Sequence, residues 1–456
     1  MHNPRILCFL SIFALMASSE VSGKPILLAE GVLAGQNDES KFQETLENGE
    51  PADVLGGMDS GLAYAGGDTF LALPDRGPNA DEYNKLVSDT TSYICRFHVM
   101  TMKLGAPRPG EKLPFSLDLQ LTQTIPLFSS TGLVYGDDID IGTRKNGKPM
   151  GAGQPPQNST TQFYFTGRSD NFDKSKGSGD ADEARLDPEA IRLSNDGKSV
   201  FVSDEYGPHL YEFDRATGQR TRSLNLPAKL FVATQSAKSK TEENKNSAGR
   251  VPNNGMEGLA ITPDGKSLVG IIQGPLLQER QQEEKLLRIV KIDIAGAAPP
   301  REYAYMLRTG SGVSEILAIN NDQFLLLERD GKGFGNRPPA VAKQHFSIDL
   351  SQAKDIANLN GSDAVKEAVS KTLFLDIVDV LKRNGRDPEE IPAKIEGMAS
   401  GADVPHDGKT MHTLYIANDN DFDETKSGKN QVYAFGFEDG DLANFMPQQF
   451  APKPKE

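Results

Sequence analysis

The chain has 456 residues, with 49 Lys and Arg against 64 Asp and Glu, so its formal net charge at pH 7 is −15. This length is enough to bury a sizeable core without disulfides, and an apolar fraction of 37% is typical of a folded soluble protein. The acidic charge argues against a nucleic-acid partner, because a polyanion would have to bind against the protein's own field. With 44 Gly and 28 Pro, the composition favours a turn-rich fold over a helical bundle.

Residues 1–23 are typical of a secretory signal peptide. A basic residue is followed by an apolar stretch over 6–17 and then by small residues, and cleavage after Ser19 or after Gly23 fits this pattern. The apolar stretch is short for a membrane anchor, and no later stretch reaches the roughly 18 continuous apolar residues of a transmembrane helix. We therefore predict an exported chain, periplasmic or secreted, with no membrane span after signal removal and a single domain over 24–456.

Five later segments share one pattern: a short strand that begins near an acid, a tight turn of Asp, Asn or Gly, and a second apolar strand. Each is typical of a β-hairpin, and antiparallel pairing would bring the acid next to the polar residue that ends the second strand. The segments lie at 57–75, 187–205, 255–273, 313–328 and 395–419. Hairpins repeated in this way, each followed by one or two further strands, predict an all-β fold of the β-propeller type.

The blade number and one insertion complete the predicted architecture. The long interval between the first and second segments has room for another blade around 163–165, so we predict six blades, with five or seven as alternatives. Apolar residues, among them Val365, Val369 and Leu373, recur at about helical spacing over 362–382, which predicts a helical insertion there.

An acid begins the inner strand of all five segments. If the segments surround one axis, these acids meet at one end of a central channel, where two carboxylates 4 Å apart repel by about 4 kcal/mol at an effective dielectric near 20. Such a ring requires protons, arginines or a cation, and oxygen ligands favour Ca²⁺ over Mg²⁺ or Mn²⁺. Each acid taken alone is as well explained by a strand-end cap or a salt bridge. The predicted metal ligands are Asp59, Glu189, Glu257, Glu315 and Glu396.

Polar residues at the ends of the second strands form a second set of candidates. Arg76 and Arg329 each directly follow an acid, and guanidinium groups there suit a phosphate or carboxylate group of a substrate, or pair with the carboxylates of the ring. The predicted substrate-binding residues are Asp75, Arg76, Arg329, Asn418 and Asp419, and the predicted catalytic base is Glu205 or Glu328.

A series of short motifs resembles the phytase-like domain family, also described as esterase-like activity of phytase. The motifs are LPDRG (73–77), DPEAI (187–191), NNGMEGLA (253–260), EYAYML (302–307), LLLERDG (325–331), IEGMA (395–399) and NDND (418–421). The resemblance implies a secreted propeller related in architecture to calcium-dependent propeller phytases, with the five acids as its anchors. It also implies hydrolysis of phosphate esters or related esters.

Three functions are open on the sequence alone. The first is a calcium-dependent hydrolase of small anionic phosphate esters, in which a metal-bound or carboxylate-activated water attacks the phosphate. The second is a metal-dependent lactonase or carboxylesterase with the same centre. The third is a noncatalytic exported binding or scaffold propeller, in which the acids and Ca²⁺ only rigidify the centre. We expect a monomer in each case.

Overall fold

The computed structural model describes residues 25–78, 83–88, 90–136, 141–280, 285–336 and 338–450. The predicted signal peptide lies outside the described residues. Within them the chain folds into antiparallel sheets with only short helices, so the predicted all-β class is confirmed.

Four sheets contain consecutive strands in sequence order. The first holds β2 (Gly61–Tyr64), β3 (Thr69–Leu73), β4 (Arg96–Gly105) and β5 (Ser116–Pro126). The second holds β8 (Pro188–Leu193), β9 (Ser199–Asp204), β10 (His209–Asp214) and β11 (Arg220–Leu224). The third holds β12 (Met256–Ile261), β13 (Ser267–Ile272), β14 (Leu286–Asp293) and β15 (Arg301–Met306). The fourth holds β16 (Gly312–Ala318), β17 (Gln323–Arg329), β18 (Lys343–Asp349) and β19 (Lys371–Asp376).

The fifth sheet joins the two ends of the described chain. Its strands are β20 (Ile395–Ser400), β22 (Lys409–Asn418), β23 (Gln431–Phe437) and, at the outer edge, β1 (Ile26–Val32), with β21 (Val404–His406) paired to β22. The N-terminal strand β1 pairs antiparallel with β23, so this sheet cannot be completed without both ends of the sequence.

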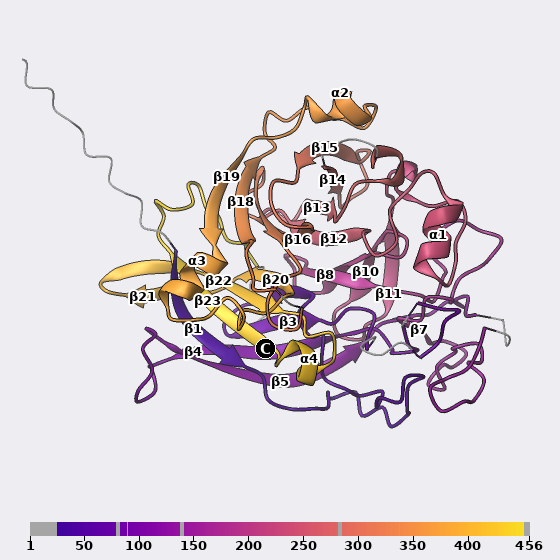
Figure 1. Cartoon of the computed structure of the whole chain (residues 1–456). Helices are drawn as coiled ribbons and strands as arrows, with labels where there is room; N and C mark the ends of the chain where they lie inside the picture. Colours follow the sequence, from indigo (N-terminus) through magenta and orange to yellow (C-terminus); the bar gives the residue numbers. More distant parts are fainter. Residues whose placement is uncertain are drawn as a thin grey trace, which may run out of the picture.

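The five inner strands form a closed ring. Each contacts the next in the order β2, β8, β12, β16 and β20, and β20 contacts β2 again. Figure 1 shows β8, β12, β16 and β20 near the middle of the molecule. The described residues therefore form a propeller of five blades, one of the two alternatives to the predicted six. The segment at 163–165, which was expected to hold a further blade, contributes β7 (Phe163–Tyr164), which pairs with β6 (Phe128–Ser129) in a two-stranded ribbon beside β11.

The hydrophobic core is divided among the five interfaces between neighbouring blades, with one large cluster in each. Because successive side chains of a strand point to opposite faces, each inner strand pair supplies two clusters at once. In β3, Leu71 and Leu73 pack toward the second blade, whereas Phe70 and Ala72 pack toward the fifth. Burial on both faces explains why these strands are mainly apolar and lack a regular alternation of apolar and polar residues.

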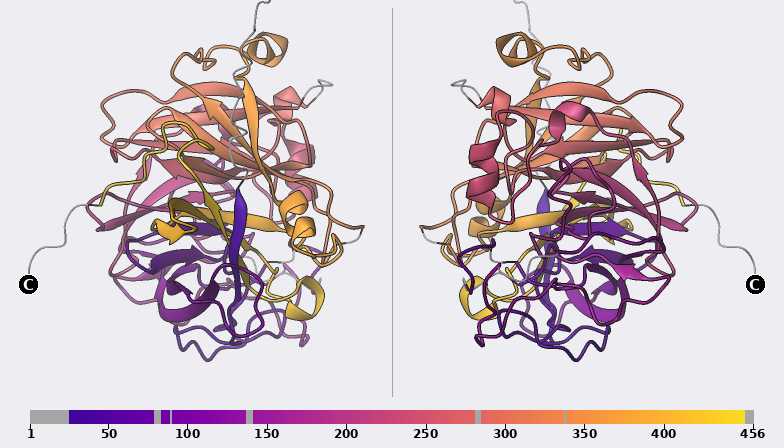
Figure 2. Two further views of the ribbon diagram at one scale, coloured as in Figure 1. Left: turned by 90° about the vertical axis from the view of Figure 1, so that its left-hand side faces the viewer. Right: turned by 90° about the vertical axis from the view of Figure 1, so that its right-hand side faces the viewer.

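The predicted helical insertion over 362–382 is helical only at its two ends. The α-helices α2 (Gly361–Val365) and α3 (Ile377–Arg383) flank β19, which completes the fourth blade. The apolar residues come from three elements with different neighbours, so their spacing only imitates one helical face. Figure 2 shows α2 projecting beyond the blades.

The remaining helices are the α-helices α1 (Ser239–Lys245) and α4 (Glu424–Ser427) and the 3₁₀ turns η1 (Ala228–Leu230) and η2 (Leu277–Glu279). Every helix in the described part of the chain is too short or too polar to cross a membrane.

Candidate functional site

A cavity of about 310 Å³ opens at the rim where the inner strands begin and the second strands end. Antiparallel pairing places these two kinds of strand end side by side in every blade, which is why residues far apart in sequence meet here. The predicted site residues that line the cavity are Asp75, Arg76, Glu189, Glu205, Glu257, Arg329, Glu396 and Asp419.

Three of the five predicted metal ligands occupy one structural position. Glu189, Glu257 and Glu396 each lie at a β-bulge, where the register between the inner strand and the second strand shifts. A bulge turns an extra residue out of the ladder, and here that residue is the acid that faces the cavity. The three glutamates belong to the second, third and fifth blades.

Glu315 does not occupy this position, which corrects the prediction for the fourth blade. The bulge of β16 falls on Ser314, so Glu315 lies one residue further along the strand and is fully buried. Its carboxylate forms an ion pair with Arg192 of the second blade, with the nitrogen and oxygen 2.8 Å apart. Ser314 lines the cavity in place of the fourth-blade acid.

Asp59 also lies outside the cavity lining. It is separated from β2 by Ser60, whose hydroxyl lies 3.5 Å from a carboxylate oxygen of Glu396. The Asp59 side chain is fully buried and neither of its oxygens has a hydrogen-bond partner. Burial, together with the nearby charge of Asp419, raises the pKa of this carboxyl well above its usual value, which favours the neutral form.

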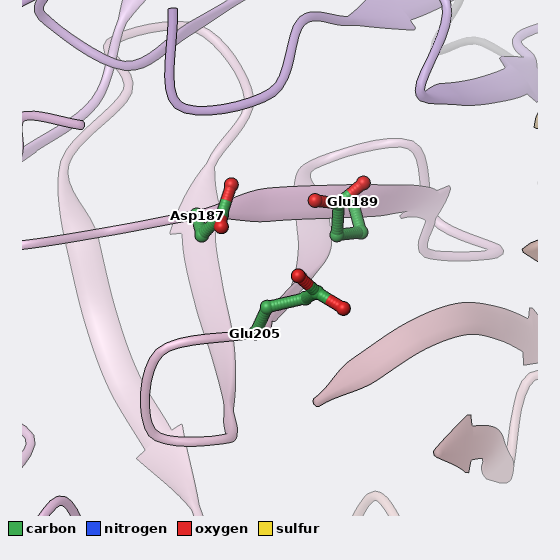
Figure 3. Close-up of side chains that lie close together, drawn as sticks. All are labelled: Asp187, Glu189 and Glu205. Carbon is green, nitrogen blue, oxygen red and sulfur yellow. The ribbon is translucent and has the colours of Figure 1, made fainter. Parts of the chain in front are cut away.

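Within the described residues, Asp187, Glu189 and Glu205 form a compact acidic cluster, which is drawn in Figure 3. One carboxylate oxygen from each can be chosen so that all three lie within 4.8 Å of one another. Asp187 is 1% exposed: one of its oxygens lies 2.5 Å from Nη1 of Arg76, and the other has no hydrogen-bond partner. Three buried carboxylates with an unpartnered oxygen fit a hard cation.

Burial and mutual repulsion disfavour the charged forms of three glutamates that line the cavity. Burial raises the pKa of Glu189 and of Glu257 well above the usual value, and the nearby carboxylates add to both shifts. Burial likewise raises the pKa of Glu205 to about 7, and this side chain hydrogen-bonds to Glu257. The cluster therefore requires either shared protons or a bound cation at neutral pH.

Positive side chains line the part of the cavity opposite this cluster. Arg329 comes from the fourth blade; its Nε donates to Ser314 at 2.6 Å and its Nη2 pairs with Glu396. Lys394, which directly precedes the inner strand of the fifth blade, pairs with Asp419 at 2.9 Å and with Asp421. In a ring of five, the fourth and fifth blades lie across the axis from the second, so these two cations, each already paired with a carboxylate, face the cluster across the cavity.

The two arginines of the predicted site do not hold equivalent positions. In the strand register Arg329 matches Asp75, one residue before Arg76. Sequence reasoning missed Asp187 as a possible ligand, although it opens one of the quoted motifs, and missed Lys394. Both lie just outside the repeated strands, so the repeat itself gave no signal for either.

Glu328 and Asn418 are buried away from the cavity. Glu328 accepts hydrogen bonds from the Tyr305 hydroxyl at 2.5 Å and the Thr309 amide at 2.6 Å, and pairs with Lys371. Its carboxylate is thus fully engaged between the third and fourth blades, which removes it as a candidate base. Asn418 accepts a hydrogen bond from the backbone of Gln431 at 2.6 Å and ties β22 to β23.

The channel is closed below the cavity by the Arg192–Glu315 ion pair. Arg192 also donates to the carbonyl oxygen of Leu62 at 2.6 Å and to that of Ile316 at 3.1 Å, so it joins the first, second and fourth blades. A separate cavity of about 30 Å³, toward the far ends of the inner strands, lies beyond this pair. The site is therefore a cup that opens at one rim.

The sequence belongs to a known family. The model of the phytase-like family, described as esterase-like activity of phytase, matches residues 53–422, and this chain belongs to that family. Membership suggests an exported hydrolase with a propeller fold, and the buried acidic cluster is compatible with the metal dependence common among such propellers.

The chain is also similar to individual proteins, at low sequence identity. The chain is 28% identical over 328 residues to an uncharacterized secreted protein of Arthroderma benhamiae, a match that covers 61% of this chain and 60% of the relative. Among solved structures, an aldose sugar dehydrogenase from Streptomyces coelicolor in its PQQ-bound form is 12% identical, with coverages of 90% and 98% and a TM-score of 0.32. A luciferin-regenerating enzyme is 10% identical, with coverages of 84% and 92% and a TM-score of 0.33. TM-scores this low carry no argument about function.

Proposed function

We propose that this chain is an exported, calcium-dependent hydrolase of small phosphate esters, with the central cavity as its active site. The observation that carries the proposal is that one cavity holds the buried carboxylate cluster on one side and the paired cations Arg329 and Lys394 on the other. A carboxylate cluster alone would suit a structural cation, and arginines alone would suit any anion. Both together suit an anionic ester bound between a cation and positively charged side chains.

The cation would be held by Asp187, Glu189 and Glu205. Oxygen ligands of this kind favour Ca²⁺, and a bound divalent ion would supply charge neutralisation at the phosphate oxygens. The Arg76 guanidinium already carries one positive charge beside the three carboxylates, which leaves a net charge of about −2 for a divalent ion to balance.

The remaining side chains would bind the phosphate and move the proton. Arg329 and Lys394 orient the anionic group from the opposite side of the cavity. Glu205, predicted as the base, would serve the cation instead. Its hydrogen-bonded neighbour Glu257 is the carboxylate left to accept the proton of an attacking water.

The proposal is tested by a matched substrate panel on the purified chain. Phosphomonoesters, lactones and carboxylic esters are compared with calcium and with EDTA, and we expect calcium-dependent turnover of the phosphomonoesters. Glu189→Gln should lower kcat/KM at least 100-fold, because it removes one charge from the cluster while keeping the shape of the side chain. Glu438→Gln, at the far rim, is the matched control and should stay within about twofold of the natural protein.

Two results would contradict this function. Turnover of lactones or carboxylic esters alone would assign the same centre to another reaction. A protein whose thermal midpoint rises with calcium but which hydrolyses no ester would be a binding or scaffold propeller.

A further inference from the structure

Among the described residues, Arg76 is the cationic side chain that pairs with a carboxylate of the candidate cation site. Its Nη1 lies 2.5 Å from an oxygen of Asp187, one of the three carboxylates of the cluster. The Asp187 side chain is 1% exposed, whereas that of Arg76 is 17% exposed and lines the cavity. The carboxylate is therefore fixed in place, and the guanidinium lies at the border between the cluster and the open cavity.

Arg76 and a divalent cation would compete for this carboxylate. At equal distance, the repulsion between a guanidinium and a doubly charged ion is twice the attraction between the guanidinium and one carboxylate. A cation shared by three carboxylates within 4.8 Å of one another would lie close to Asp187, and hence close to Arg76. The ion pair that stabilises the cation-free cluster is thus weakened once the cluster is neutralised.

We propose that Arg76 is the resident counter-ion of the cation site, and that it exchanges Asp187 for the anionic group of the substrate when the cation binds. This inference rests on the proposed function. It makes cation binding and anion binding mutually favourable, because each removes a competitor of the other. Coupling of this kind is reciprocal and typically amounts to 5- to 150-fold in affinity.

Arg329 provides an internal comparison. It also lines the cavity, but its carboxylate partner is Glu396, which is not one of the three residues of the cluster. Removing Arg329 should therefore weaken anion binding without relieving competition for the cation. Loss of Arg76 should therefore raise calcium affinity and loss of Arg329 should leave it nearly unchanged, a difference that a general loss of positive charge would not produce.

The test is titration calorimetry on the full chain after removal of divalent ions, with Ca²⁺ alone and then with inorganic phosphate at saturating calcium. Arg76→Gln should bind calcium about 10-fold more tightly than the natural protein and bind phosphate at least 10-fold more weakly. Arg76→Lys, which keeps the charge, should return calcium affinity toward the natural value. Arg329→Gln should weaken phosphate binding while calcium affinity stays within about threefold.

The outcomes separate this inference from the proposed function. Unchanged or weaker calcium binding by a folded Arg76→Gln variant would overturn the inference, because it would show that Arg76 only holds Asp187 in position. A natural protein that binds calcium and hydrolyses phosphate esters would keep its proposed function in that case. Absence of calcium binding by the natural protein would overturn both.

Discussion

Replacing Arg192 by Met is expected to destabilise the propeller by about 5 kcal/mol. The Arg192 and Glu315 side chains are 3% and 0% exposed, and removal of one partner of such a buried pair costs about 3–5 kcal/mol because the other charge is left uncompensated. Arg192 also donates to two carbonyl oxygens of other blades, and each of these hydrogen bonds contributes about 1 kcal/mol. The expected loss is therefore large compared with that of an ordinary surface substitution.

A double-mutant cycle separates the charge effect from the lost packing. Equilibrium unfolding in urea, followed by circular dichroism because the chain has no Trp, gives the free energy of unfolding of Arg192→Met, Glu315→Gln and the double variant. The double variant should be about 3 kcal/mol more stable than the sum of the two single effects predicts, since Gln requires no counter-charge. Strict additivity would refute the reasoning.

The same variant should respond to pH. Burial raises the pKa of Glu315 to about 7, although Arg192 lowers it in part, so removal of the arginine shifts the pKa further upward. In the Arg192→Met variant the Glu315 carboxyl would be neutral at pH 5. The loss of unfolding free energy caused by the substitution should therefore be smaller at pH 5 than at pH 8. A penalty that is equal at both pH values would show that lost hydrogen bonds and packing account for all of it.

Three further outcomes are expected. Calcium at 100 times its dissociation constant should stabilise the fold by about 2.7 kcal/mol. A thermal midpoint that is the same with and without EDTA would contradict a cation site. In the calcium-free protein, the stability that comes from protonated Glu205 is fully present below its unfolded pKa of about 4.3 and is lost as the pH rises through about 7. The thermal midpoint measured in EDTA should therefore fall across this pH range. In calcium the thermal midpoint should fall less. Gly258→Ala should lower the free energy of unfolding, measured in urea, by about 1–3 kcal/mol, because its Cβ would lie 2.8–2.9 Å from the backbone of Glu315 and Ile316. Gly132→Ala is the control and should be neutral, because a Cβ there would have no atom within 4 Å.

The repeat was sufficient to predict the propeller and the meeting of acids at one rim, but not which residue of each strand faces the cavity. A shift of one residue along a strand moves a side chain to the opposite face, and in the fourth blade the acid lies one residue beyond the bulge instead of on it. Aligning the segments on their acids therefore equated Glu315 with Glu257. In the structure the match of Glu257 is Ser314, and Glu315 takes the place of Gly258.

The Arg192–Glu315 ion pair below the cavity could not be predicted from the repeat either. Arg192 is the only charged residue within β8 besides Glu189, and a lone Arg in an otherwise apolar inner strand was the available signal for a buried partner. Its partner lies two blades away. Only the closed order of the blades shows that Glu315 can reach it.

The antiparallel pairing of β1 with β23 sets the direction in which the molecule would be presented from a tether. Ile26 pairs with Gly436, and Val32 with Gln431, so the N-terminal end of β1 lies beside the end of β23 that is remote from the cavity rim. A fusion partner or immobilising linker placed before β1 therefore extends from the face opposite the opening. Molecules attached in this way to a surface or a bead would keep the entrance to the cup directed toward the solution.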